Sequence, residues 1–280
     1  MTSTILAAQI NPELSDREFM KLSQLIHELS GINLGEHKQS LLRARLVKRL
    51  RALGIPTFTD YYDFVTQGDS SGEESIHMLD AISTNLTEFF REPAHFDYLK
   101  DVFFRRWKNE PVIKILSAGC STGEEAYSIA ICNREVFGES ASLKLKIVAG
   151  DICTRALARA KAGIYDTDKI KSISPQRLRA NFMYGTGSSR GLVCVSPEVR
   201  SSVEFMHLNL TEPLHFNGPF HAIFCRNVAI YFNKATQAQV FEKLGRSLLP
   251  GGTMFVGHAE SLTTFSRGFA YVQPAVYERR

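Results

Sequence analysis

The feature that most constrains the fold is a glycine-containing turn in residues 112–125, V-I-K-I-L-S-A-G-C-S-T-G-E-E. Its apolar start predicts a short buried strand, and the residues that follow predict a helix. Glycines at 119 and 123 let a ligand approach the backbone, because no Cβ stands in the way and a helix N-terminus offers free N–H groups. The stretch therefore predicts a parallel α/β unit with a candidate cofactor site.

The spacing of these glycines leaves two readings open. It differs from the dinucleotide fingerprint, and no lysine follows the second glycine as it would in a P-loop. A tight strand-to-helix turn that binds nothing explains the same residues. Spacing alone does not decide between the two.

Composition excludes several classes of protein. A chain of 280 residues with 44% hydrophobic and 22% charged residues is typical of a soluble globular protein with room for a core domain and an appendage. The five cysteines form no C-x-x-C pair and the eight histidines show no ligand spacing, so no disulfide framework and no metal site are expected. No apolar run approaches a membrane span, and residues 1–10 lack the features of a signal peptide, which predicts a cytoplasmic location without membrane insertion.

The N-terminal region reads as helical. A capping box at Ser15–Glu18 and a stop at Gly31 bound the first helix, and Gly54 ends a second. The second carries a stripe of Leu42, Leu46, Leu50 and Leu53 and six cations without an acid: Lys38, Arg43, Arg45, Lys48, Arg49 and Arg51. Such a helix packs one face and presents positive charge elsewhere, which suits nucleic acid, lipid or an acidic protein helix; a merely solvated face is the alternative.

Residues 73–91 predict a further helix that ends in N-L-T-E-F-F-R. Its polar side chains Asn85, Thr87 and Arg91 either line a site or cap the helix end. Strands and helices alternate from residue 112 onward, which predicts a parallel sheet, and residues 265–269 and 275–280 are expected to add partly antiparallel strands.

Polar residues follow three of the predicted strands. Asp151 follows the second strand, at the place where such folds hold ribose hydroxyls, although it would also cap the next helix. Asn209 ends the strand from residue 203. Arg226 and Asn227 follow the strand at 221–225, where a substrate would meet the cofactor.

Residues 165–203 interrupt the alternation. The turn G-T-G-S-S-R-G at 185–191 beside a short β run predicts a small antiparallel insertion, whose edge could accept a strand from another chain or could be a plain surface hairpin. A single cofactor without phosphates suits the whole pattern. S-adenosylmethionine offers an amino-acid end to the glycine loop and a ribose to the acid.

Five motifs, in order, resemble one family: N-L-T-E-F-F-R-E at 85–92, S-A-G-C-S-T-G-E-E-A-Y-S-I-A at 117–130, G-T-G-S-S-R-G-L-V at 185–193, F-C-R-N-V-A-I-Y-F at 224–232 and G-H-A-E-S at 257–261. They are similar to the CheR-type chemotaxis methyltransferases, which convert chemoreceptor glutamates into methyl esters with S-adenosylmethionine. The resemblance implies a class I, Rossmann-like methyltransferase domain at 96–280. It also implies an inserted β-subdomain at about 170–203, a linker at 77–95 that contributes to the cofactor site, and an all-helical domain at 1–76.

The resemblance also implies roles for single residues. Arg91 and Tyr231 are expected near the methyl-transfer centre, with no catalytic base. The expected cofactor contacts are Asn85, Thr87, Arg91, Gly119, Gly123, Glu125, Asp151, Asn209, Leu210, Arg226 and Asn227. Cys120 and Gly150 depart from the residues usual at their positions, and neither change removes a polar contact.

The implied partner is the cytoplasmic helical bundle of a chemoreceptor. Glutamates on that bundle would attract Arg43, Arg45, Lys48, Arg49 and Arg51, and a receptor C-terminal peptide could add a strand to the β-subdomain. A monomer is expected. Two rivals remain: an RNA methyltransferase, which lacks support because the chain shows no aromatic RNA-binding motif, and a non-catalytic adaptor that senses the cofactor.

Overall fold

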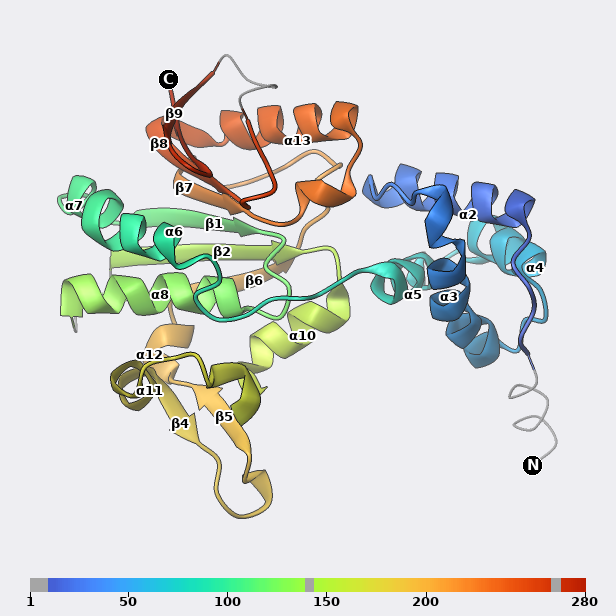
Figure 1. Cartoon of the computed structure of the whole chain (residues 1–280), viewed down its shortest axis with the longest axis horizontal. Coiled ribbons are helices and arrows are strands. Elements are labelled where there is room, and N and C mark those ends of the chain that lie inside the picture. Colours follow the sequence, from blue (N-terminus) through green and yellow to red (C-terminus); the bar gives the residue numbers. More distant parts are fainter. Residues whose placement is uncertain (1–9, 139–143, 263–267) are drawn as a thin grey trace. The chain divides into compact units, whose positions relative to one another are not determined.

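The chain folds into two units of unequal size (Figure 1). The computed structural model describes residues 10–138, 144–262 and 268–280. One unit comprises the chain up to Thr84 together with Tyr231–Asn233, and the other comprises Asn85–Ile230 and Lys234–Arg280. The predictions made for residues 1–9 and for most of the strand at 265–269 lie outside the described residues.

The first unit is helical, as predicted. Its elements are α2 (Asp16–Ser30), η1 (Glu36–Lys38), α3 (Gln39–Leu53), α4 (Phe58–Asp63), η2 (Phe64–Gly68) and α5 (Glu73–Ile82). The Ser15 side chain and the Glu18 side chain cap α2 reciprocally, and Gly31 ends the helix with a φ of 73°. Local sequence signals therefore fixed both ends of α2.

Helix α3 buries most of the predicted stripe. Leu42, Leu46 and Leu50 are buried, but Leu53 is 38% exposed and Val47 is buried in addition. Gly54 ends the helix with a φ of 69°, a left-handed conformation that suits a residue without Cβ. The buried face of α3 therefore includes Val47 and excludes Leu53, unlike the predicted stripe.

The helix predicted over residues 73–91 is wrong in its second half. Helix α5 ends at Ile82, and Phe90 and Glu92 have φ values of 55° and 57°, which no α-helix accommodates. The two units divide between Thr84 and Asn85, whereas the predicted boundary at residue 76 falls inside α5. Asn85 to Glu92 is therefore an extended, strained connection and not a helix end.

The second unit is built on a seven-stranded sheet in the order β6-β2-β1-β7-β8-β10-β9 (Figure 1). The strands are β1 (Ile113–Ala118), β2 (Leu145–Asp151), β6 (Val203–His207), β7 (Phe220–Cys225), β8 (Leu248–Val256), β9 (Phe269–Gln273) and β10 (Val276–Arg279). Strands β6, β2, β1, β7 and β8 are parallel to one another, and β10 is antiparallel to both of its neighbours.

The helical segments between the strands are α6 (Pro93–Tyr98), η3 (Leu99–Phe103), α7 (Phe104–Arg106), α8 (Glu124–Phe137), α10 (Thr154–Ala162), α12 (Pro197–Arg200), η7 (Ala229–Tyr231) and α13 (Lys234–Arg246). The chain moves from β1 outward to β2 and β6, then returns to β7 on the other side of β1. Parallel crossovers are right-handed, so this reversal opens a crevice at the carboxyl ends of β1 and β7. Ligands of such sheets bind in that crevice.

A second, three-stranded antiparallel sheet has the order β3-β5-β4. Its strands are β3 (Ile164–Asp166), β4 (Phe182–Tyr184) and β5 (Leu192–Val195). The segments between these strands include η5 (Thr167–Ile170), α11 (Pro175–Asn181) and η6 (Gly187–Ser189). Phe89 packs edge-on against Tyr165 and Phe182, which joins the connection at 85–92 to this small sheet. The predicted insertion is confirmed, and it begins at residue 164, before the expected limit of about 170.

Candidate functional site

The turn at residues 119–123 lies at the carboxyl end of β1 and leads into α8. The N–H groups of Gly119 and Cys120 both donate to the Gly150 carbonyl, at 2.8 and 2.9 Å. Gly119, Ser121 and Gly123 have φ values of 83°, 50° and 95°. The turn is therefore fixed to the end of β2 through a left-handed backbone.

The two glycines are required by packing inside the protein. A Cβ on Gly119 would lie 2.2 Å from Cγ2 of Val228, and one on Gly123 would lie 2.9 Å from Cβ of Ala160. The space that the sequence reading reserved for a ligand is thus filled by these neighbours. The glycines therefore set the shape of the turn, which lies at the carboxyl end of β1.

Asp151 ends β2 and is 7% exposed. Its Oδ2 accepts the Ser121 N–H at 2.7 Å, and its Oδ1 accepts the Cys153 N–H at 2.8 Å, next to the start of α10. The carboxylate therefore joins the glycine turn to the next helix. Asp151 therefore lies both at the carboxyl end of a strand and beside the start of a helix, the two settings expected from the sequence.

Asn209 and Leu210 follow β6, the neighbour of β2, and both are buried. The Leu208 N–H donates to the Asp151 carbonyl at 3.0 Å, and the Asn209 Oδ1 accepts the Thr211 N–H at 3.1 Å. Parallel pairing thus places the ends of β1, β2 and β6 side by side.

Arg226, just beyond β7, is the centre of a buried ion cluster. Its side chain is 2% exposed; Nη1 donates to Glu125 Oε2 at 2.9 Å, and Nη2 lies 3.1 Å from Glu92 Oε2. Nη2 also donates to the Arg91 carbonyl at 2.5 Å, and Ser117 Oγ donates to Glu125 Oε1 at 2.7 Å. The cluster ties β1, α8, β7 and the 85–92 connection together.

This cluster holds one cation and two carboxylates, so its formal charge is negative. Burial by itself would raise the pKa of Glu92, but Arg226 and the His258 N–H outweigh burial and hold that pKa below its ordinary value. The carboxylate is therefore ionised at neutral pH. A positively charged or hydrogen-bond-donating ligand group suits the adjoining crevice.

The predicted residues of the 85–92 connection occupy three different settings. Asn85 Nδ2 contacts Cys153 Sγ at 3.2 Å, and the Thr87 carbonyl accepts Lys169 Nζ at 3.2 Å. Arg91 Nη1 donates to the Leu86 carbonyl at 3.1 Å. The connection thus lies along the β1 and β2 ends of the sheet and carries Arg91 toward the Arg226 cluster.

Asn227 has a φ of 58°, and its N–H donates to Glu260 Oε2 at 2.9 Å. The chain then leaves the larger unit: the Tyr231 carbonyl accepts the Asn33 N–H at 2.8 Å, and Phe232 forms an antiparallel bridge with Ile32. Tyr231 therefore belongs with the helical unit. Its expected role at the methyl-transfer centre stays a prediction.

The cations of α3 are tied into their own unit. Arg43 donates to the Pro12 carbonyl, Arg45 to the Ile82 carbonyl and Arg51 to the Ile10 carbonyl. Arg49 forms an ion pair with Glu74, at 2.9 and 2.5 Å. Lys48 is exposed. These arginines therefore also hold the helices together, and their expected role in attracting a receptor stays a prediction.

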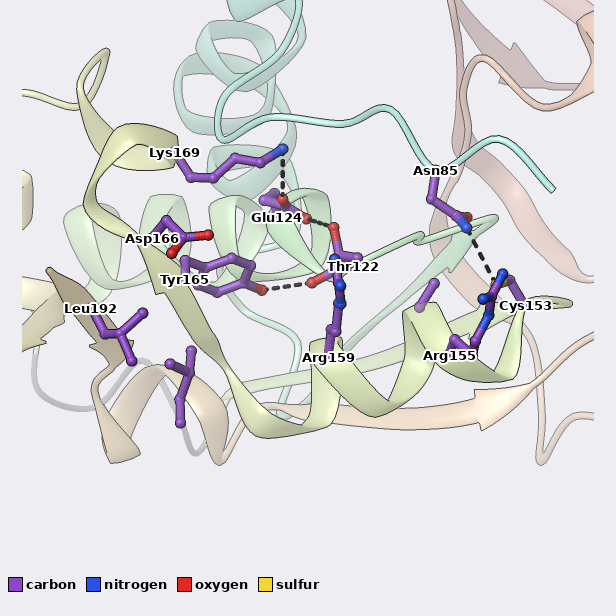
Figure 2. A pocket seen from close by; sticks show the side chains of 12 residues that line it. Asn85, Thr122, Glu124, Cys153, Arg155, Arg159, Tyr165, Asp166, Lys169 and Leu192 are labelled. Atoms are coloured by element: carbon purple, nitrogen blue, oxygen red, sulfur yellow. Dashed lines mark hydrogen bonds and ion pairs between the residues drawn. The ribbon is translucent and has the colours of Figure 1, made fainter. Parts of the chain in front are cut away.

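A separate pocket of about 440 Å³ lies beside α10 and β3 (Figure 2). In Figure 2, Thr122 Oγ1 donates to Glu124 at 2.6 Å and Tyr165 OH donates to the Thr122 carbonyl at 2.7 Å. Asn85 is the expected cofactor residue that lines it. The lining residues are Asn85, Thr122, Glu124, Cys153, Arg155, Ala156, Arg159, Ile164, Tyr165, Asp166, Lys169 and Leu192.

Among the described residues, Glu92, His95 and His258 bring metal-ligating atoms within 4.8 Å of one another. Sequence spacing missed this group because the fold joins distant segments. Arg226 already lies 3.1 Å from Glu92 Oε2, and its charge opposes a divalent cation there. Burial, with Arg226, lowers the pKa of His95 to about 4. The expectation of no metal stays a prediction.

Sequence reasoning assigned no role to Glu92, Glu260 or Ser128. Ser128 Oγ accepts the Phe90 N–H at 3.0 Å and so supports one of the strained residues. Glu92 and Glu260 both stand within quoted motifs, R-E at 91–92 and H-A-E at 258–260, and that position was the available signal. Their partners are distant in sequence, which explains why the roles were missed.

Comparison with known families accounts for both units. The model described as "CheR methyltransferase, all-alpha domain" matches residues 17–83, and the model described as "CheR methyltransferase, SAM binding domain" matches residues 85–277. The two matches meet at the boundary between the units. No helix within the described ranges has the length and apolar character needed to cross a membrane.

Several named relatives match nearly end to end. A "Chemotaxis protein methyltransferase" of Salmonella typhimurium is 41% identical over 277 residues, which cover 99% of this chain and 94% of the relative. The protein of the same name from Escherichia coli is 40% identical over 277 residues, covering 99% and 95%. "Chemotaxis protein methyltransferase 2" of Pseudomonas aeruginosa is 38% identical over 261 residues, covering 93% and 92%.

Proposed function

Because the chain belongs to the CheR methyltransferase family, we propose that it transfers a methyl group from S-adenosylmethionine to glutamate side chains of chemoreceptors for sensory adaptation. The observation that carries the proposal is the near full-length similarity to relatives named chemotaxis protein methyltransferase. The fold class expected from the sequence is confirmed. The protein acts as a cytoplasmic monomer in this proposal.

The polar groups in the crevice fit this cofactor. Asp151 at the end of β2 suits ribose hydroxyls, and Asn209 and Leu210 at the end of β6 suit the neighbouring base. The negative Arg226 cluster suits the ammonium and sulfonium charges, with Glu125 as its contact residue. Asn85, Thr87, Gly119, Gly123 and Asn227 complete the proposed cofactor set.

The chemistry asks mainly for alignment. S-adenosylmethionine supplies a methyl group that its sulfonium already activates. A glutamate carboxylate is ionised at neutral pH, so no general base is required. Arg91 holds the incoming carboxylate through charge-assisted hydrogen bonds, and Tyr231 orients it.

The receptor surface in this proposal is a helical bundle that bears glutamates. Lys48, which is exposed, contributes most directly to attraction, and Arg43, Arg45, Arg49 and Arg51 contribute through the field of α3. The edge strands of the β3-β5-β4 sheet offer unpaired backbone groups to a receptor C-terminal peptide. Titration with such peptides tests that second contact.

The decisive experiment incubates the protein with labelled S-adenosylmethionine and a receptor signalling domain, and measures base-labile methyl ester. Label on RNA, or cofactor binding without transfer to either substrate, would contradict the proposal and support a rival. Arg91→Ala and Tyr231→Phe test the two catalytic assignments. Unchanged turnover and cofactor affinity in both variants would refute the assignments while leaving the reaction standing. Light scattering tests the monomer.

A further inference from the structure

The turn after β7 is held by one carboxylate. Glu260 Oε2 accepts the N–H groups of Asn227 and Gly257 at 2.9 and 2.6 Å, and Oε1 accepts those of Val228 and Ile230 at 3.1 and 3.3 Å. Successive backbone N–H groups that converge in this way form an anion-binding nest. Here the anion is a side chain of the protein itself.

The nest joins two neighbouring parallel strands. The Asn227–Ile230 segment follows β7, whereas Gly257 follows β8, and the two strands pair along their length. A Cβ on Gly257 would lie 2.9 Å from both the Asn227 N and Glu260 Oε2. The approach of the two strand ends therefore leaves room for Glu260 and little else.

The turn held in this way is strained. Asn227 has a φ of 58°, a left-handed conformation that asparagine tolerates better than most residues with a side chain but that persists mainly where the surroundings impose it. Hydrogen bonds from its own N–H and from the next residue's N–H to Glu260 impose it here. Without the Glu260 carboxylate these hydrogen bonds are lost, and the turn can adopt another backbone conformation.

Two contacts transmit the position of this turn to the proposed cofactor site. Val228 Cγ2 fills the space opposite Gly119, at 2.2 Å from where a Cβ would stand, so Val228 sets the glycine turn. Asn227 Nδ2 donates to Glu92 Oε1 at 3.4 Å, and Arg226 directly precedes Asn227. A shift of the turn would therefore move the Arg226 cluster and the glycine turn together.

We propose that Glu260 is a positioning residue for the cofactor site: its carboxylate holds the Arg226–Ile230 turn in the strained shape that presents Arg226 and Asn227 to the cofactor. The inference rests on the proposed function, since it takes the cofactor contacts of these two residues from it. Glu260 itself touches no substrate.

The test compares Glu260→Gln and Glu260→Asp with wild type, using calorimetric titration with S-adenosylhomocysteine and receptor methylation kinetics. Glutamine removes the charge and replaces one accepting oxygen with an N–H donor group. Aspartate keeps the charge but is shorter. We expect the dissociation constant to rise at least ~10-fold in the glutamine variant and less in the aspartate variant, with an unchanged KM for receptor.

Two control variants separate positioning from stability. Val240→Ala removes buried volume from α13 and lowers the melting temperature, and Glu242→Gln removes an exposed charge from the same helix. Both should bind S-adenosylhomocysteine as wild type does. Wild-type affinity in Glu260→Gln, or equal losses in Glu260→Gln and a Val240→Ala variant of similar stability, would overturn the proposal. Failure of wild type to bind the cofactor product would instead overturn the proposed function.

Discussion

Two ion-paired arginines, one in each unit, differ in what surrounds them. Arg49 of the helical unit meets Glu74, whose side chain is 5% exposed and whose Oε1 also accepts the Tyr61 hydroxyl at 2.7 Å. Arg226 of the larger unit meets two carboxylates and a backbone carbonyl at the end of the sheet. The Arg49 side chain remains 23% exposed, whereas the Arg226 side chain is 2% exposed.

The difference separates structural from functional charge. An ion pair among the helices of a bundle has its main effect on stability. A cluster at the carboxyl ends of parallel strands keeps its charges where ligands bind. Ion pairing alone therefore does not identify a site; burial together with place in the fold does.

The largest expected effect comes from removing Arg226. Arg226→Met leaves the largely buried Glu92 and Glu125 without their cation. This should lower the free energy of unfolding by about 3–5 kcal/mol. Methylation of receptor should fall at least ~100-fold, and the dissociation constant of S-adenosylhomocysteine should rise by a similar factor. Calorimetry and labelled transfer measure both, with circular dichroism as the folding control. Near wild-type affinity would make Arg226 a structural arginine like Arg49.

Glu74→Gln tests the other side of the comparison. The change strands Arg49 in the helical unit and should lower the free energy of unfolding by about 3 kcal/mol. Hydrogen exchange of α3 and α5 should accelerate, while affinity for S-adenosylhomocysteine in the folded protein stays unchanged. The double variant Arg49→Met/Glu74→Leu should recover much of the stability. Loss of cofactor affinity in the single variant would break the distinction between the two arginines.

His95 gives the Arg226 cluster a pH dependence. Its pKa is lowered from 6.5 to about 4 by burial and by Arg226, with Glu92 opposing and His258 adding to the shift. The unfolded chain therefore binds more protons than the folded one between these values, so stability is complete above pH 6.5 and is lost as pH falls. Urea unfolding at pH 7 and pH 5 should differ by about 2 kcal/mol more in wild type than in His95→Phe. Equal differences in the two proteins would contradict the assignment.

The smallest expected effect concerns Lys48, the exposed cation beside Arg49. Lys48→Glu should raise the KM for receptor a few-fold, equivalent to about 1 kcal/mol, and the effect should shrink as salt rises. Cofactor affinity and stability should not change. The half-buried Lys38, changed to Gln, is a mild control at the other end of the cluster. An unchanged KM would remove α3 from the proposed receptor surface.

Local signals in the sequence predicted much of this chain. The capping box at Ser15–Glu18 and the glycines at 31 and 54 fix helix ends through neighbouring residues alone. The alternation of strands and helices predicted the parallel sheet, and the residues after the strands were predicted to line the crevice, which stays a prediction. These signals act over a few residues, so they can be read without the fold.

Other features required the folded chain. The helix predicted over residues 73–91 stops at Ile82, and further along, the Ser128 hydroxyl and the Arg226 guanidinium hold Phe90 and Arg91, where the backbone is left-handed at Phe90 and Glu92. The glycine at 119 makes room for Val228, and the cations of α3 bond to carbonyls and to Glu74. None of these partners is near in sequence.

The sequence by itself determined the family, the order of the elements and the chemistry of the residues at the strand ends. Only the tertiary structure decided that Arg49 pairs with Glu74 among the helices and that Arg226 meets Glu92 and Glu125 at the end of the sheet. The physical reason is that periodicity, caps and motifs are local, whereas the electrostatic role of a side chain depends on all the groups that burial brings within a few ångströms of it.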